Sequence, residues 1–178
     1  MYKRLLIVVD SRPVSDAAIR EGLTLAQAHG AEVVFFSVLP RYTVPVADMP
    51  PFPMLSPQQF LRATRSNAQK RLSEATAQAE KAGVASRTAM GSGEDDSHCI
   101  AEAASRRRCD IVVVATEGRN ALLRLLTGSV VPGLITASPV PVLVCKDRQR
   151  SRARAKATVV PLKPRRAAPR AAAARQAS

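Results

Sequence analysis

Short apolar runs, rich in β-branched residues, recur along the first 146 residues of the chain. Most of these runs are too short for a helix and are apolar at successive positions rather than at alternate ones, a pattern typical of parallel strands covered on both faces. The run at 84–90 is the least apolar of them. The pattern predicts five strands, at residues 5–9, 33–39, 84–90, 111–114 and 140–145.

Between these runs, apolar residues repeat at helical spacing. Gly30 and Gly83 are suitable helix ends. Alternating strands and helices predict one α/β domain: an open, five-stranded parallel sheet with helices on both faces, similar to the Rossmann fold. The predicted apolar stripes are Ile19, Gly22, Leu23 and Ala26; Phe60, Ala68, Leu72, Ala75 and Ala79; Ile100, Ala103 and Ala104; and Val130, Val131, Leu134 and Ile135.

Two segments depart from this rhythm. Residues 40–57 hold six prolines, which exclude a helix and a central strand and predict a long extended loop. Residues 147–178 hold ten Lys and Arg against one Asp, with Pro and Ala but no apolar periodicity, which predicts a disordered basic tail after a domain at 1–146.

The net charge of +13 therefore sits mainly in the tail. Such a tail resembles those of histone-like bacterial proteins, and it would bind nucleic acid through phosphates without reading sequence. An acidic protein or a membrane surface would attract it equally, and a solubilising role needs no partner.

Membrane insertion and secretion are not expected. The apolar run after Lys3 and Arg4 ends at Asp10, which is too short for a signal peptide, and no stretch is long enough to span a bilayer. Cys99, Cys109 and Cys145 follow no metal-ligand or redox spacing, which fits small buried side chains in a reducing cytoplasm.

Candidate chemistry lies in the loops after Val9, Leu39 and Val114, because ligands of such sheets bind beyond the carboxyl ends of the strands. In the third loop, Gly118 would let backbone N–H groups approach a phosphate. Gly128-Ser129 opens a helix whose amino terminus favours an anion. The Ser129 hydroxyl would donate to that anion or simply cap the helix.

These residues resemble the G-x2-G-x9-G-[S/T] motif that universal stress proteins carry after the fourth strand. Gly118, Gly128 and Ser129 match it, whereas Ala115 stands at the first glycine. The Val-Val-Asp10 strand end and the run from Ser138 to Val144 also match, so the resemblance covers residues 2–146 apart from the proline-rich loop.

The resemblance implies a fold like that of the adenine nucleotide alpha hydrolases and a site for ATP, alone or with Mg. Asp10 would lie beside the adenosine and Val38 would face the adenine. Ala115, Gly118 and Arg119 would line the ribose and phosphates, and Gly128, Ser129 and Val130 would bind the distal phosphates through N–H groups.

Simpler roles remain open at three of these positions. Asp10 would equally cap the first helix, Val38 would equally be core, and Arg119 would equally be a solvated charge. If the backbone at Ala115 needs a positive φ, its methyl costs roughly 1 kcal/mol, about a tenfold loss of affinity.

A dedicated enzyme is not expected. The chain lacks a P-loop lysine and the Ser-Gly-Gly loop of ATP pyrophosphatases. His29 lies at a predicted helix end, and His98 lies in an acidic turn that precedes a helix. The resemblance implies instead a stress-response regulator that acts through protein partners.

The family also pairs its last strand across a two-fold axis, which predicts a homodimer through Val140 to Cys145. The alternative function is therefore a dimer that binds no nucleotide and whose basic tail tethers it to nucleic acid or another acidic surface.

Overall fold

Five parallel strands form one sheet in the order β3-β2-β1-β4-β5. The computed structural model describes residues 1–10, 15–42, 56–116 and 130–146. The strands are β1 (Arg4–Val8), β2 (Glu32–Val38), β3 (Ser86–Gly91), β4 (Ile111–Thr116) and β5 (Val142–Lys146). The five predicted strands and their parallel arrangement are confirmed.

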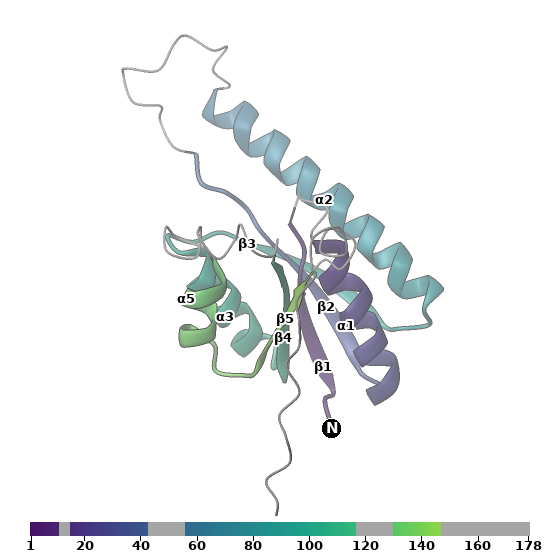
Figure 1. Ribbon diagram of the computed structural model, residues 1–178. Coiled ribbons are helices and arrows are strands. Elements are labelled where there is room, and N and C mark those ends of the chain that lie inside the picture. Colours follow the sequence, from purple (N-terminus) through teal and green to yellow (C-terminus); the bar gives the residue numbers. More distant parts are fainter. Residues whose placement is uncertain (11–14, 43–55, 117–129, 147–178) are drawn as a thin grey trace, which may run out of the picture.

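Helices cover both faces of this sheet, as predicted. α1 (Ser15–His29) and α2 (Pro57–Lys81) lie on one face, and α3 (Asp96–Arg106) and α5 (Val130–Ala137) lie on the other (Figure 1). The central strands β1, β2 and β4 are almost continuously apolar because they lie between two helical layers, whereas the edge strands β3 and β5 have one buried residue each.

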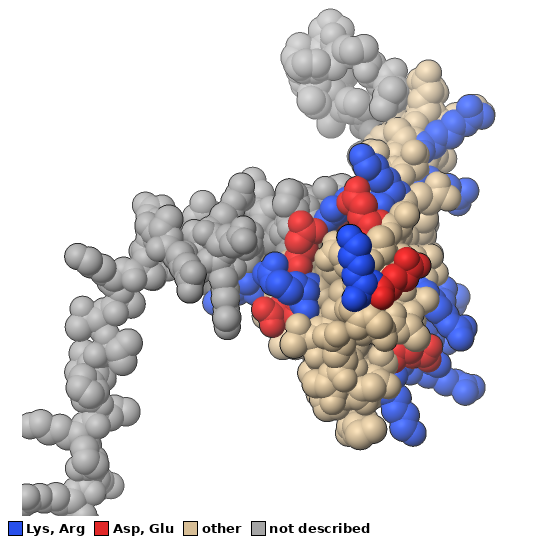
Figure 2. Space-filling view, turned by 90° about the vertical axis from the view of Figure 1, so that its right-hand side faces the viewer, with Lys and Arg blue, Asp and Glu red and all other residues tan. Residues whose placement is uncertain are grey.

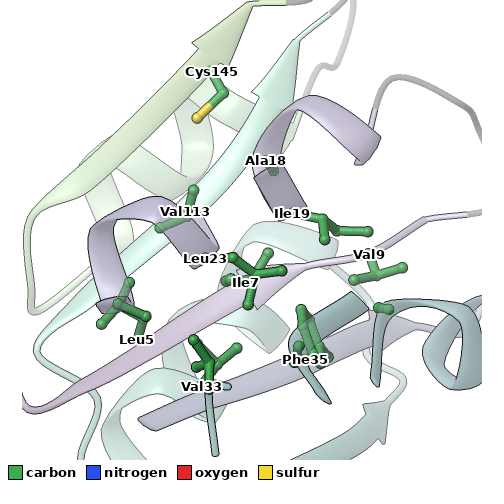
Figure 3. Packing of buried hydrophobic residues seen from close by; sticks show 14 of the residues in the cluster. Leu5, Ile7, Val9, Ala18, Ile19, Leu23, Val33, Phe35, Val113 and Cys145 are labelled. Atoms are coloured by element: carbon green, nitrogen blue, oxygen red, sulfur yellow. The ribbon is translucent and has the colours of Figure 1, made fainter. Parts of the chain in front are cut away.

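Side-chain alternation along the strands divides the core into two clusters. Leu5, Ile7 and Val9 face α1, together with Phe35 of β2 (Figure 3), whereas Leu6 faces α3 and α5. All five side chains are 0% exposed. The two clusters lie on opposite faces of the sheet. The fold therefore buries apolar area on both sides of every central strand.

The ends of the first two helices follow the predicted glycines. Gly30 and Gly83 have φ of 62° and 67°, a conformation in which a Cβ is unfavourable. α2 begins at Pro57, the last residue of the predicted loop, because the first helical position needs no N–H donor. Ser56 caps this helix in a capping box with Gln59.

Three details of the predicted elements are corrected. Ile135 belongs to a predicted apolar stripe, but it is 59% exposed. Leu134 is the residue through which α5 is buried. Phe60 lies on α2 before its first buried residue, Ala68, and its ring contacts Tyr42 instead of the core. Val140 precedes β5, because its backbone bonds with the Ser138 hydroxyl in a turn.

The cysteines are mostly buried, as expected. Cys109 and Cys145 are 5% and 6% exposed, and this burial raises the pKa of each thiol to about 11. Cys99 is half-buried, and burial raises the pKa of its thiol as well. The three thiols are therefore protonated and weakly nucleophilic at neutral pH.

Other expectations fall beyond what the structure describes. Most of the proline-rich loop (43–55) and the whole basic tail (147–178) lie outside the described residues, and the domain boundary at 146 stays a prediction. Within the described ranges, no helix combines the length and apolarity that crossing a bilayer requires.

Close contact between α1 and the sheet depends on Gly22. A Cβ at this position would lie 2.4 Å from Cδ1 of Ile7 and 3.7 Å from Cγ1 of Val113, both in fully buried side chains. We expect Gly22→Val to lower the free energy of unfolding by about 1–3 kcal/mol through overpacking.

Urea unfolding followed by circular dichroism measures this change. Thr24→Val, on the exposed side of the same helix, introduces the same residue and should change stability by less than about 0.5 kcal/mol. Equal effects at the two positions would show that α1 does not approach the sheet at Gly22.

Candidate functional site

The sheet brings the predicted site residues of three strands to its carboxyl edge. β1 lies between β2 and β4, and its register pairs Val8 with Phe36 and Ile7 with Val113. Extended by two or three residues, this register sets Asp10 beside Val38 on one side and beside Thr116, the neighbour of Ala115, on the other. The bond from the Val9 N–H to the Phe36 carbonyl, 2.8 Å, continues the β1–β2 ladder toward Asp10.

The chain changes direction across the sheet at this same edge. From β1 it proceeds to β2 and β3, and it then returns past β1 to β4 and β5. Open α/β sheets bind ligands beyond the carboxyl ends of the two strands at which strand order reverses, here β1 and β4. Asp10 follows the end of β1, and Ala115 lies near the end of β4.

The amino terminus of α5 adds a site for negative charge. Along the chain, α5 connects the parallel strands β4 and β5, and it begins at Val130. Its free N–H groups therefore lie at the carboxyl edge of the sheet. A helix amino terminus attracts an anion through these N–H groups and its dipole. The remaining predicted residues, Gly118, Arg119, Gly128 and Ser129, lie outside the described residues.

Three of the described site residues also pack against the hydrophobic core. Val38 and Val130 are partly buried against the α3–α5 cluster, and Ala115 is partly buried against the α1–α2 cluster. These contacts agree with the simpler role for Val38, and they leave part of each side chain open at the edge.

The condition for backbone strain at Ala115, a positive φ, is not met. Ala115 lies inside β4, opposite Cys145, and Arg108 is the one residue other than glycine with a positive φ in the described part of the chain. A methyl group at position 115 therefore carries no backbone penalty, and it affects a ligand only through its own volume.

A charged cluster beside Asp10 was not predicted from the sequence. Arg71 of α2 donates to Asp16 Oδ1 at 2.7 Å and to the Asp10 carbonyl at 3.4 Å. Figure 2 views the molecule from the side of α1 and α2, where basic and acidic side chains lie interspersed. No motif marks Arg71, because its partners lie 55 and 61 residues earlier.

The acidic turn before α3 is a helix cap, as the sequence indicated. Asp95 is the N-cap residue, and hydrogen bonds from the Ser97 hydroxyl and the N–H groups of His98 and Ser97 hold the pKa of its carboxyl below the usual value. Burial and the neighbouring Asp95 raise the pKa of Asp96.

Each of the two histidines takes part in a contact within the fold. His29 ends α1 and its ring contacts Tyr2, with centroids 5.2 Å apart, and the N–H of His98 belongs to the α3 cap. No three His, Cys, Asp or Glu residues of the described ranges are placed to hold a metal ion.

A shallow hollow of about 400 Å³ lies at the opposite, amino edge of the sheet. It includes Gly30, Gly83 and Glu32, and the Glu32 carboxylate already pairs with Arg4 and Arg87. The Glu32 carboxylate of this hollow is thus already paired, and none of the predicted site residues lines the hollow. The carboxyl edge of the sheet is therefore the better candidate for a binding site.

Comparison with known proteins places the chain among its relatives. The sequence profile of the Universal stress protein family matches residues 1–146. A universal stress protein of Methanocaldococcus jannaschii is 31% identical over 150 residues, which cover 82% of this chain and 83% of that protein.

Solved structures share the fold. A universal stress protein of Archaeoglobus fulgidus in complex with dAMP has a TM-score of 0.60 at 18% identity, covering 82% of this chain and 98% of that one. A family protein of Arabidopsis thaliana with AMP bound has a TM-score of 0.61 at 14% identity, covering 84% of this chain and 94% of that one.

Proposed function

Because the chain belongs to the universal stress protein family, we propose that it binds an adenine nucleotide at the carboxyl edge of the sheet. The observation that carries the proposal is the strand register, which sets Asp10 beside Val38 and beside the end of β4 at the reversal of strand order. β4 ends at this edge at Thr116, and α5 begins at this edge at Val130.

Each part of the site would recognise one part of the nucleotide. Asp10 would accept hydrogen bonds from the adenosine, and Val38 would contact the adenine. Ala115, Gly118 and Arg119 would line the ribose and the first phosphate. The N–H groups of Gly128, Ser129 and Val130 would bind the distal phosphates, because the helix dipole favours negative charge there.

ATP, alone or with Mg, is the nucleotide that we propose. The Arabidopsis and Archaeoglobus relatives are described with AMP and dAMP, which supports an adenine site. A third phosphate would use the N–H groups of α5 that a monophosphate leaves unpaired. Mg would bridge phosphate oxygens, the ligands that it prefers.

The nucleotide would act as a signal and not as the substrate of a dedicated enzyme. Neither His29 nor His98 lies at the carboxyl ends of β1 and β4, and the Asp10 carboxylate there would accept hydrogen bonds from the adenosine instead of acting as a general base for an attacking water. We propose a cytoplasmic stress-response regulator whose contacts with protein partners change with nucleotide occupancy.

Thermal unfolding in the presence of nucleotides tests the proposal. ATP at about one hundred times its dissociation constant stabilises a protein by about 2.7 kcal/mol, which for a domain of this size raises the melting temperature by about 5–10 °C. GTP, as the control, should raise it much less. Equal melting temperatures with and without millimolar ATP and AMP would overturn the proposal.

A tethering dimer is the second candidate function. β5 pairs with β4 alone and ends the described sheet, and its Leu143 is 37% exposed, so a second copy would cover an apolar edge. The ten basic residues of 147–178 would then be presented twice.

Binding to duplex DNA at increasing salt tests this function. We expect an affinity that falls steeply with salt and is lost when the ten tail Lys and Arg are replaced by Gln, because each neutralised phosphate releases counterions. A monomeric mass in light scattering, or unchanged DNA binding by the Gln variant, would contradict it.

A further inference from the structure

Arg71 ties three elements of the chain together beside the proposed nucleotide site. Its guanidinium donates to Glu74 Oε2 and Asp16 Oδ1, both at 2.7 Å, to Ser15 Oγ at 3.3 Å and to the Asp10 carbonyl at 3.4 Å. The donor therefore comes from α2, and its acceptors include Asp10, the second residue after β1, and the first turn of α1.

Ser15 of α1 also holds the Asp10 backbone. Its hydroxyl donates to the Asp10 carbonyl at 3.3 Å, and the residue is 2% exposed. The Asp10 carbonyl thus receives two donors, one from α1 and one from α2. One guanidinium therefore contacts both Asp10, beyond the carboxyl end of β1, and Ser15, the first residue of α1.

Global stability alone does not account for this arrangement. The Arg71 side chain is 22% exposed, and its partners Asp16 and Glu74 are 48% and 43% exposed. Ion pairs with this much solvent exposure contribute little to the free energy of folding. The core stripe of α2, Ala68 to Ala79, is buried next to Arg71 and docks the helix without it.

The arrangement instead fixes the Asp10 backbone relative to α1 and α2. A binding group already held in its bound position loses less entropy when the ligand arrives. Arginine suits this role because its planar fork reaches a carboxylate, a hydroxyl and a carbonyl at once, which the single ammonium of lysine does not.

We propose that Arg71 is a positioning residue of the nucleotide site, which holds the Asp10 backbone against the first turn of α1 in the position that accepts the nucleoside. This inference rests on the proposed function. Arg71 acts through the Asp10 backbone and not on the phosphates, so its contribution is the same whatever the number of phosphates.

Calorimetric titration of the full chain with adenosine, AMP and ATP tests the inference, using Arg71→Met, Arg71→Lys and Asp16→Asn. Arg71→Met should weaken all three ligands by the same factor, about tenfold, as one lost charge-assisted hydrogen bond implies. Arg71→Lys and Asp16→Asn should show smaller losses, again equal for the three ligands.

Arg65→Met is the matched control, because Arg65 lies exposed on the same helix and has no ion pair within the described residues. It should leave the three affinities unchanged. Hydrogen exchange of the free protein should show faster exchange near residues 11–16 in Arg71→Met but not in Arg65→Met, while the melting temperatures of the two variants stay similar.

Two results would overturn the inference while the proposed function stands: unchanged affinities in Arg71→Met, or a loss that grows from adenosine to ATP, which would place Arg71 on the phosphates. If the unaltered protein binds none of the three ligands, the proposed function fails and the inference falls with it. The unaltered protein in the same titration therefore separates the two failures.

Discussion

Gly128→Val is expected to weaken ATP binding by about a hundredfold or more and to leave adenosine binding nearly unchanged. In the proposed site the backbone N–H groups at Gly128, Ser129 and Val130 donate to the distal phosphates. A branched side chain at position 128 would hold the phosphates away from these donors, and two lost bonds to a charged group correspond to about 3 kcal/mol or more.

Equilibrium dialysis with labelled ATP and labelled adenosine measures both affinities. Gly83→Ala is the control, because Gly83 has a φ of 67° and open space around it on the loop between α2 and β3, away from the predicted site. It should cost about 1 kcal/mol of stability and no affinity. Equal losses for adenosine and ATP in Gly128→Val would show that this loop does not hold the phosphates.

Phe35→Ala is expected to lower the free energy of unfolding by about 3–5 kcal/mol. Phe35 is 0% exposed at the centre of β2, next to Ile7 in the pairing with β1. Removing its ring forfeits the burial of a large apolar group and leaves a cavity that the sheet cannot close. Since domains of this kind are stable by about 5–15 kcal/mol, the variant would be close to unfolding.

Urea unfolding at 25 °C provides the measurement, and Ile135→Ala provides the control. Ile135 is also a large apolar residue, but it is 59% exposed on α5, so its truncation should cost less than about 1 kcal/mol. If both variants lose the same stability, the division between core and surface described above is wrong.

The sequence was sufficient for the fold because the central strands β1, β2 and β4 have only one way to be buried. Runs such as Leu5 to Val9 have no polar face, so they must lie between two helical layers, and glycines such as Gly30 mark where α1 must end. The end of α3 could not be predicted in this way, because Arg108, with a φ of 53°, takes the place of glycine there.

The site was only partly predictable. A motif identifies residues that are close in sequence, and strand order then brings Asp10, Val38 and Ala115 to one edge. The contact of Arg71 with Asp10 and the first turn of α1 depends on how α2 lies across the sheet, and helical periodicity does not determine that angle. The strain suggested for Ala115 also required the structure, because only the backbone shows that this residue continues β4.

Isothermal titration calorimetry of the full chain with ATP tests the central claim most directly. A nucleotide held at the carboxyl edge of this sheet predicts saturable heat with one site per chain, and competition by AMP. The absence of heat at millimolar ATP, in a preparation freed of bound nucleotide by unfolding and refolding, would contradict the claim and leave only the fold and the family.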